Sequence, residues 1–169
     1  MRAVALICLA VFLFCGCKRG ENANLKEPIN GAFGWALGVR LPAAFEVRTN
    51  VTAIQYVDPR GKVPPFEQVV LDLTVDRTIC AITGVFNQAD PKAVAALNTS
   101  LEQALRQKYI FKKKTAEGGV STIQFGEGAR EVILATTVQP PTLALCYRDT
   151  DSVRKAQEEM TRLKATVRN

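Results

Sequence analysis

Two adjacent stretches with strand-like patterns constrain the fold of this chain more than any other feature. In residues 68–75 every second residue is Val or Leu, and residues 79–86 are rich in β-branched side chains. A period of two is typical of a strand with one buried face, and the polar residues 76–78 between the stretches are typical of a tight reversal. The sequence therefore predicts an antiparallel hairpin, with Asp72 and Asp76 on its solvent side.

Other segments extend this hairpin into a sheet. Residues 45–51 alternate in the same way, and the pattern slips by one position before Ile54 and Tyr56, which indicates a bulge or a bend. Three further apolar runs, separated by Gly-rich or Pro-rich turns, predict strands over 120–125, 131–138 and 142–147. We therefore expect a mostly antiparallel sheet of about five to six strands.

Two amphipathic helices complete the predicted fold. Asp90 and Pro91 form a typical helix start, and apolar residues then recur at helical spacing, which predicts a helix over 90–111. A second stripe predicts a helix over 150–167. Because strands and helices follow each other in blocks, the sequence predicts a single α+β domain over 31–169, with both helices packed on one face of the sheet.

The N-terminal residues have the pattern of an export signal. Met1 and Arg2 form a positive start, and residues 3–14 are a run of twelve apolar residues. A membrane-spanning helix needs about 20 apolar residues, so this run is short for one and matches a secretory signal. A lipoprotein signal, an ordinary cleaved signal and an uncut N-terminal anchor are the alternatives.

The end of this run, Phe14, Cys15, Gly16 and Cys17, resembles the lipobox of bacterial lipoproteins. The resemblance implies that residues 1–16 are a signal peptide that is removed, and that Cys17 receives a diacylglyceryl group and further acylation such as palmitate. It also implies a cell-envelope protein facing the periplasm, with the outer membrane favoured because Lys18 follows the cysteine. Residues 17–30 would form the lipidated end and a polar tether.

The composition excludes several kinds of site. The chain has no histidine, so it cannot form a Ser-His-Asp triad or a His-containing zinc site. Only three cysteines follow residue 16, too few for a four-cysteine zinc site. The net charge of +6 is spread along the chain, and no nucleic-acid-binding motif is present. We therefore expect no metal, no cofactor and no nucleic-acid partner.

Two groups of residues are candidate sites besides Cys17. Cys80 and Cys146 lie in predicted strands, and they are either a disulfide, which is expected in an oxidising compartment, or two separate buried thiols. A disulfide requires that both side chains point to the same face of the sheet. The second group is a cluster of four lysines, Lys108, Lys112, Lys113 and Lys114. These lysines either contact an anionic surface or place favourable positive charge at the C-terminal end of a helix.

These observations favour a binding or structural module of unknown ligand over an enzyme. One alternative is an assembly or inhibitor protein that docks another envelope protein through a face or an edge of its sheet, which predicts an exposed apolar patch. The other alternative is a carboxylate-based envelope hydrolase. That activity predicts two convergent carboxyl groups with raised pKa values in one pocket.

Overall fold

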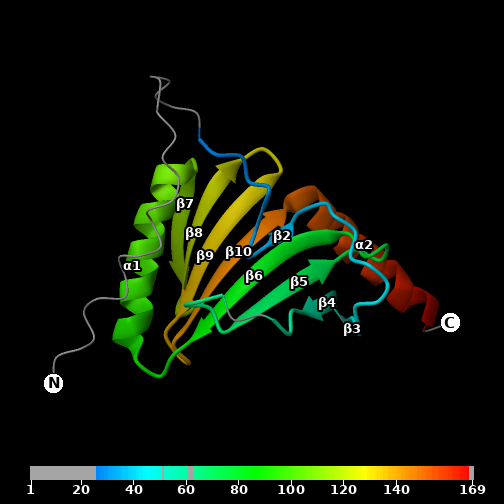
Figure 1. Ribbon diagram of the computed structural model, residues 1–169, viewed down its shortest axis with the longest axis horizontal. Helices are drawn as coiled ribbons and strands as arrows, with labels where there is room; N and C mark the ends of the chain where they lie inside the picture. Colours follow the sequence, from blue (N-terminus) through cyan, green and yellow to red (C-terminus); the bar gives the residue numbers. More distant parts are fainter. Residues whose placement is uncertain (1–25, 51, 61–62, 168–169) are drawn as a thin grey trace.

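An α+β fold with one large antiparallel sheet is the architecture of the protein, according to a computed structural model that describes residues 26–50, 52–60 and 63–167. Two helices accompany an eight-stranded sheet and a small two-stranded sheet (Figure 1). The large sheet has the strand order β3-β4-β5-β6-β10-β9-β8-β7, and each neighbouring pair is antiparallel.

The elements have the following bounds. The small sheet consists of β1 (Gly31–Ala32) and β2 (Trp35–Ala36). The large sheet consists of β3 (Arg48–Thr49), β4 (Ile54–Val57), β5 (Gln68–Leu73), β6 (Ile79–Asn87), β7 (Phe111–Glu117), β8 (Val120–Glu127), β9 (Arg130–Thr137) and β10 (Thr142–Asp149). The helices are α1 (Pro91–Lys108) and α2 (Thr150–Val167).

The predicted hairpin is confirmed as β5 and β6, with a register irregularity between Asp72 and Leu73. The strand count was underestimated. The segment 45–57 contains two short strands, β3 and β4, and β7 was not predicted at all. The run of lysines before Lys114 has no strand periodicity, and all seven residues of β7 are exposed, so no hydrophobic alternation reveals this edge strand.

The two faces of the sheet have different chemistry. One face, here the front face, carries large buried side chains that include Leu71, Leu134 and Leu145. The opposite back face carries the alternate residues, which include Asp72 and Cys146. Because side chains alternate along a strand, the register of the ladders assigns every residue of the sheet to one of these faces.

Helix α1 packs on the front face. Asp90 caps its first turn by accepting a hydrogen bond of 2.9 Å from the backbone N–H of Lys92, as the sequence predicts. Val94 and Leu105 are buried in the same core as the front-face residues. The helix ends at Lys108, earlier than predicted, because Tyr109 is extended and the chain enters β7. Since β6 and β7 point the same way with three strands between them, the helix is the crossover that joins them.

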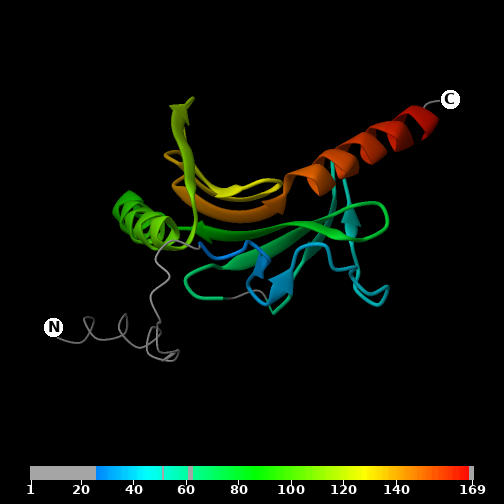
Figure 2. The same ribbon diagram turned by 90° about the horizontal axis from the view of Figure 1, so that it is seen from above.

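Helix α2 packs on the back face, so the prediction that both helices share one face is wrong. Its residues Val153, Ala156 and Met160 lie against back-face residues that include Asp72. Figure 2 shows α1 and the N-terminal segment on one side of the sheet and α2 on the other. The physical reason is that residues 26–47 already occupy the front face of β5 and β6, where Leu37 and Leu41 are buried.

The segment 26–30, which was assigned to the tether, contacts the domain. Ile29 is 7 % exposed and belongs to the core. The backbone N–H of Glu27 donates to the carbonyl of Lys108 at 3.0 Å. The Nζ atom of Lys26 donates to two carbonyls at the C-terminal end of α1, each at 3.1 Å. The described part of the chain is therefore fastened to the domain from its first residues.

A glycine on β6 makes room for this N-terminal segment. A Cβ atom on Gly84 would lie 2.6 Å from Cζ of Phe33, whose ring packs edge-on against Phe66 at 5.0 Å between centroids. We expect Gly84→Ala to lower the free energy of unfolding by about 1–3 kcal/mol, the usual cost of overpacking, in urea denaturation. Adding Phe33→Ala to this variant should remove the clash, so the two effects should not be additive. Additive losses would contradict this packing.

Candidate functional site

A cavity of about 250 Å³ lies between α2 and the back face of the sheet. Its helix side is formed mainly by apolar residues of α2, and its floor is formed by β4, β5 and β6. The lining residues are Thr52, Ala53, Gln55, Asp72, Leu73, Cys80, Val153, Ala156, Gln157 and Met160.

Asp72 is the charged group of this cavity. It lies on β5 between Leu71 and Leu73, both of which are buried on the front face, so its own side chain points to the back. Its Oδ1 atom accepts a hydrogen bond of 2.7 Å from Nε2 of Gln55. No ion pair within the described part of the chain involves Asp72. Burial raises the pKa of this carboxyl group, and the hydrogen bond from Gln55 offsets only part of that effect.

A second buried carboxyl group, Asp58, provides a direct contrast. Its two oxygens accept hydrogen bonds from Nε1 of Trp35 at 2.9 Å and from the guanidinium and backbone N–H of Arg60. Burial acts to raise the pKa of Asp58, but these hydrogen bonds outweigh burial and the pKa is lowered. The Arg60 guanidinium also lies 5.3 Å from the centre of the Trp35 ring. Asp58 is therefore fixed by hydrogen bonds from two residues, one of them a cation. The Asp72 carboxylate has a single hydrogen-bond donor, the Gln55 amide.

The two candidate cysteines are both free thiols, and both belong to the back face. Cys146 pairs with Thr83, three residues along β6 from Cys80. Three residues at about 3.3 Å each separate Thr83 from Cys80 along the strand. The Cα atoms of Cys80 and Cys146 therefore lie at least about 10 Å apart, beyond the roughly 7 Å that a disulfide spans. Burial, together with the negative charge of Asp72, raises the pKa of Cys80 to about 12 and also raises that of Cys146. Both groups are therefore protonated, unreactive thiols at neutral pH.

The four candidate lysines do not form one surface. Three of them are engaged in ion pairs: Lys108 with Glu27 at 3.3 Å, Lys112 with Glu131 at 2.9 Å and Lys114 with Glu102 at 3.1 Å. Lys114 reaches α1 on the front side, whereas Lys112 reaches Glu131 on the back face, which also binds Arg148 at 2.9 Å. In the described residues, Lys113 alone of the four has no ionic partner.

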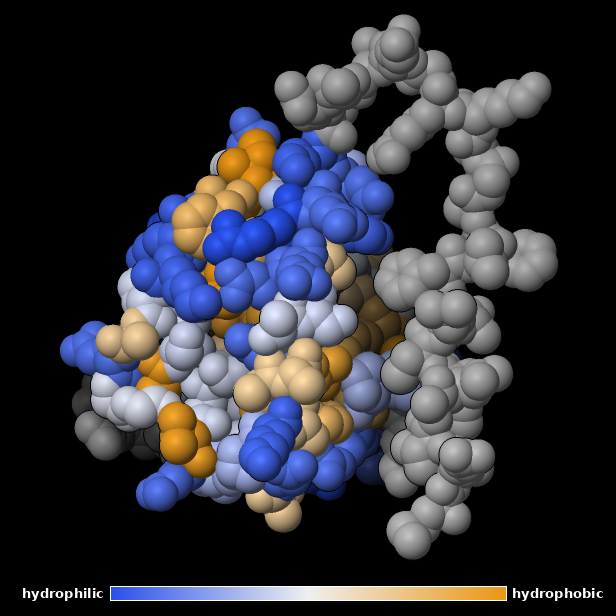
Figure 3. Space-filling view, turned by 90° about the vertical axis from the view of Figure 1, so that its left-hand side faces the viewer, coloured by the Kyte–Doolittle hydropathy of each residue, from blue (hydrophilic) through white to orange (hydrophobic). Residues whose placement is uncertain are grey.

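The side of the molecule that carries α1 and the open edge of the sheet is largely hydrophilic, with small separate hydrophobic patches (Figure 3). The edge strand β7 combines three lysines with a register irregularity between Phe111 and Lys113. Lysines and bulges on an edge strand are features that prevent pairing with the strand of another chain. This edge is therefore poorly suited to binding an added strand.

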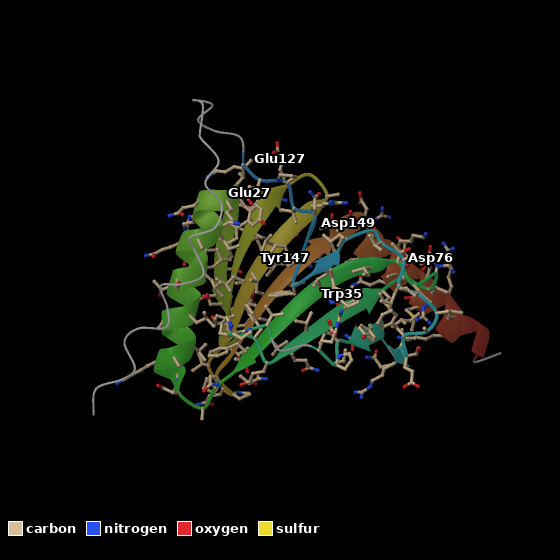
Figure 4. All side chains as sticks on the ribbon, in the orientation of Figure 1. Glu27, Trp35, Asp76, Glu127, Tyr147 and Asp149 are labelled. Atoms are coloured by element: carbon tan, nitrogen blue, oxygen red, sulfur yellow. The ribbon has the colours of Figure 1, made fainter. Side chains whose placement is uncertain are left out.

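Another cleft, of about 490 Å³, lies where residues 26–30 meet the end of α1 and the turn between β8 and β9. Glu27 and Glu127 both lie at this end of the sheet (Figure 4). Glu27 is paired with Lys108, and Arg130 donates to the carbonyl of Ile29 at 2.9 Å. These contacts fasten the N-terminal segment to the domain, so the cleft is primarily a structural joint.

Part of the back face is covered by neither helix. We call it the open back face, and its members are small or β-branched side chains and one glutamine, all of them half-buried. They are Val70, Thr83, Val85, Thr122, Gln124, Ile133, Ala135, Ala144 and Cys146. Figure 2 shows that β7 and α2 rise from this same side of the sheet at its two ends. The open back face therefore lies between them.

Several further findings limit what these sites can be. The described residues contain no group of three or more Cys, Asp or Glu side chains that could hold a metal ion. No helix in the part of the chain that the structure describes is long and apolar enough to span a membrane. The cavity beneath α2 holds one carboxyl group, so it lacks the convergent pair that a carboxylate hydrolase requires.

Comparison with known proteins gives no further guidance. No protein-family model, no curated protein and no solved structure matches this chain. Cys17, the residue with the clearest resemblance to a known motif, lies outside the described residues.

The sequence placed Asp72 on the solvent side of the hairpin, and this interpretation is wrong. The alternation correctly separates Asp72 from the core residues Leu71 and Leu73. The error arises because α2 covers this part of the back face, and the position of that helix is not encoded near Asp72. The sequence offers one signal for the burial of Asp72. It is a polar residue between two buried strand residues, in a chain that also contains an amphipathic helix whose position on the sheet the sequence does not assign.

The contrast between the two aspartates gives a stability prediction. Since the pKa of Asp72 is raised in the folded protein, its ionisation disfavours folding: stability is highest below the unfolded pKa of about 4 and falls as pH rises through the folded pKa. We expect Asp72→Asn to raise the free energy of unfolding at pH 7 by about 0.5–2 kcal/mol.

The matched variant Asp58→Asn should have the opposite effect. Its pKa is lowered, so its contribution is present above the unfolded pKa and is lost as pH falls through the folded value. We expect a loss of about 1–3 kcal/mol at pH 7, because hydrogen bonds to a charged group are weakened. Urea denaturation between pH 3 and pH 7, about the range in which carboxyl groups titrate, measures both variants. Destabilisation by Asp72→Asn at pH 7 would mean that Asp72 is a structural residue.

Proposed function

We propose that the protein is a lipid-anchored binding module of the bacterial cell envelope, and that it holds another envelope protein on its open back face. One observation carries the proposal: the half-buried side chains of this face have neither helix above them, whereas the front face is covered by α1 and the N-terminal segment. A sheet face with apolar side chains is stable in water when another layer packs on it. Here that layer would come from the partner.

The size and chemistry of the open back face favour an amphipathic helix as the contacting element. The face spans five strands, β5, β6, β10, β9 and β8, so it is about 19 Å wide at the usual strand spacing. A helix with its side chains is about 10–12 Å across and therefore fits one at a time. The five apolar members, Val70, Val85, Ile133, Ala135 and Ala144, are matched by an apolar helix stripe.

The acidic residue beside the middle strands of this face is already paired. Glu131 binds both Lys112 and Arg148 on the neighbouring rung, and none of the members of the open back face is charged. A partner that brought a charged side chain onto this face would have to desolvate it without compensation. The contact surface of the partner is therefore uncharged and apolar. It packs on the sheet face rather than on the lysine-bearing edge strand β7.

The lipid anchor would hold the domain, and with it the bound partner, at the membrane. If Cys17 carries lipid, eight residues lie between it and Lys26, where the chain is fastened to the domain, and the nine steps from Cys17 to Lys26 span at most about 32 Å when extended. Two or three acyl chains hold a protein stably on a membrane. The bound partner would therefore be kept close to the membrane surface.

The anchor is tested by Cys17→Ser, with Cys15→Ser as the matched control two positions upstream. We expect the mature protein from the membrane fraction to begin at Cys17 and to carry acyl mass, and we expect Cys17→Ser to remove that mass and release the protein from membranes. Cys15→Ser should keep both. Intact-mass spectrometry makes the measurement, and an acylated, membrane-bound Cys17→Ser variant would contradict the anchor.

Binding at the open back face is tested by Ala135→Arg, with Ala96→Arg as the matched control. Ala135 is half-buried on the open back face, and Ala96 is exposed on the solvent side of α1. We expect both variants to stay folded within about 0.5 kcal/mol, because neither residue lies beneath another element. Only Ala135→Arg should displace the partner, because it places a charge in an apolar contact.

The readout is a photo-crosslinker in living cells. Placed at Thr122 on the open back face, it should give one discrete adduct, which Ala135→Arg removes and Ala96→Arg retains. Placed at Thr99, on the exposed surface of α1, it should give no such adduct. An adduct that is the same from both positions, or one that Ala135→Arg leaves intact, would contradict docking at this face.

A further inference from the structure

The Asp72 carboxylate lacks a cation where other carboxylates of the protein have one. Glu102 binds Arg106 at 2.7 Å and Lys114 at 3.1 Å, and Glu131 binds Lys112 and Arg148. Asp72 is partly buried like these residues, yet its Oδ1 has only the Gln55 amide as a donor and no donor reaches Oδ2 in the described residues. A partly desolvated carboxylate without a cation is costly, and the Oδ2 atom is not sealed off from solvent, so the carboxylate beside this cavity can accept from a ligand that supplies the charge.

The rest of the cavity has the chemistry of a short amphipathic ligand. Val153, Ala156 and Met160 of α2 form an apolar wall opposite the Asp72 carboxylate. Gln55 and Gln157 add amide groups at the sides. The volume of about 250 Å³ equals that of about eight liquid water molecules, which suits a small organic molecule. Thr52 is an exposed lining residue, so the cavity is reached from solvent.

We propose that this cavity binds a small primary ammonium ion with a short aliphatic chain. The ammonium group donates hydrogen bonds to the Asp72 carboxylate, and the aliphatic chain lies along Val153, Ala156 and Met160. This site is separate from the open back face and goes beyond the proposed docking function. Such a ligand would also bridge β5 and α2, and so stabilise the packing of the helix on the sheet.

Other cations fit the lining less well. A calcium ion takes six to eight oxygen ligands and magnesium takes six, whereas Asp72 is the only carboxylate that lines the cavity. A quaternary ammonium ion is bound by aromatic rings, and the lining contains no aromatic residue. A primary ammonium has N–H donors for a carboxylate, so it is the cation that this set of residues recognises.

The proposal is tested by titrating the full-length protein, in detergent and at constant ionic strength, with n-butylammonium chloride. Two-dimensional NMR follows the side-chain amides of Gln55 and Gln157 and the backbone amides of α2. We expect saturable shifts confined to these groups, with a millimolar dissociation constant that is ordinary for so small a ligand. The neutral isostere 1-butanol and the tetramethylammonium ion should each bind at least about tenfold more weakly.

Variants separate this site from general effects of amines. Asp72→Asn should weaken binding about tenfold or more, because it removes a charge-assisted hydrogen bond. Asp76→Asn is the matched control: Asp76 is an exposed carboxylate in the adjacent turn that accepts from Thr74, and its loss should leave the affinity unchanged. Ala156→Leu should fill the cavity and abolish binding, which keeps the test decisive if Asp72→Asn does not fold.

Several results would overturn the proposal. Equal affinity for 1-butanol would mean that the site is only apolar. Unchanged binding in Asp72→Asn, or equal losses in Asp72→Asn and Asp76→Asn, would mean that Asp72 is not the recognising group. Shifts that fail to saturate at about 100 mM, or that appear equally at Thr122 on the open back face, would mean non-specific binding only.

Discussion

The pairing of β10 with both β6 and β9 is the interaction on which the rest of the structure depends. The last strand in the chain becomes a central strand of the sheet, with β6 on one side and β9 on the other. Without it, strands β3 to β6 and strands β7 to β9 would be two separate sheets, and β6 and β9 would become two further edges. The contacts are also far apart in sequence, since Leu143 pairs with Phe86, so the loop-closure entropy must be offset by burial of the core.

The register of that pairing decides the chemistry of both faces. Leu143 and Leu145 point to the front, where α1 and the N-terminal segment bury them, and Ala144 and Cys146 point to the back. A shift of one residue would exchange these sets and place leucines on the open back face. The same register therefore builds the core and places small side chains on the back of the sheet, where we propose that a partner docks. Helix α2, which follows β10 directly, covers only one end of the whole back face.

The partly buried carboxylates of the protein differ in whether a cation accompanies them. Asp58, Glu102 and Glu131 are held by arginine or lysine side chains, and hydrogen bonds lower their pKa values despite burial. Asp72 is the exception, in a cavity that its neighbours leave unfilled. Sites that bind charged ligands often reduce stability in the free protein, because the compensating charge arrives with the ligand. The proposed ammonium site and the proposed docking face thus use different parts of the back of the sheet.

Local sequence determined the elements whose signals are short-range. The β5–β6 hairpin, the Asp90 cap with Pro91 and the limits of the final helix were all predicted, because alternation, capping and helical spacing act over a few residues. The resemblance at Cys17 and the absence of histidine also come from the sequence alone. Only the tertiary structure decided the existence of β7 as an edge strand, the back-face position of α2, the burial of Asp72 and the separation of Cys80 from Cys146. These features depend on which distant strands pair and which face is already occupied, and such non-local packing leaves no periodic mark on the residues it affects.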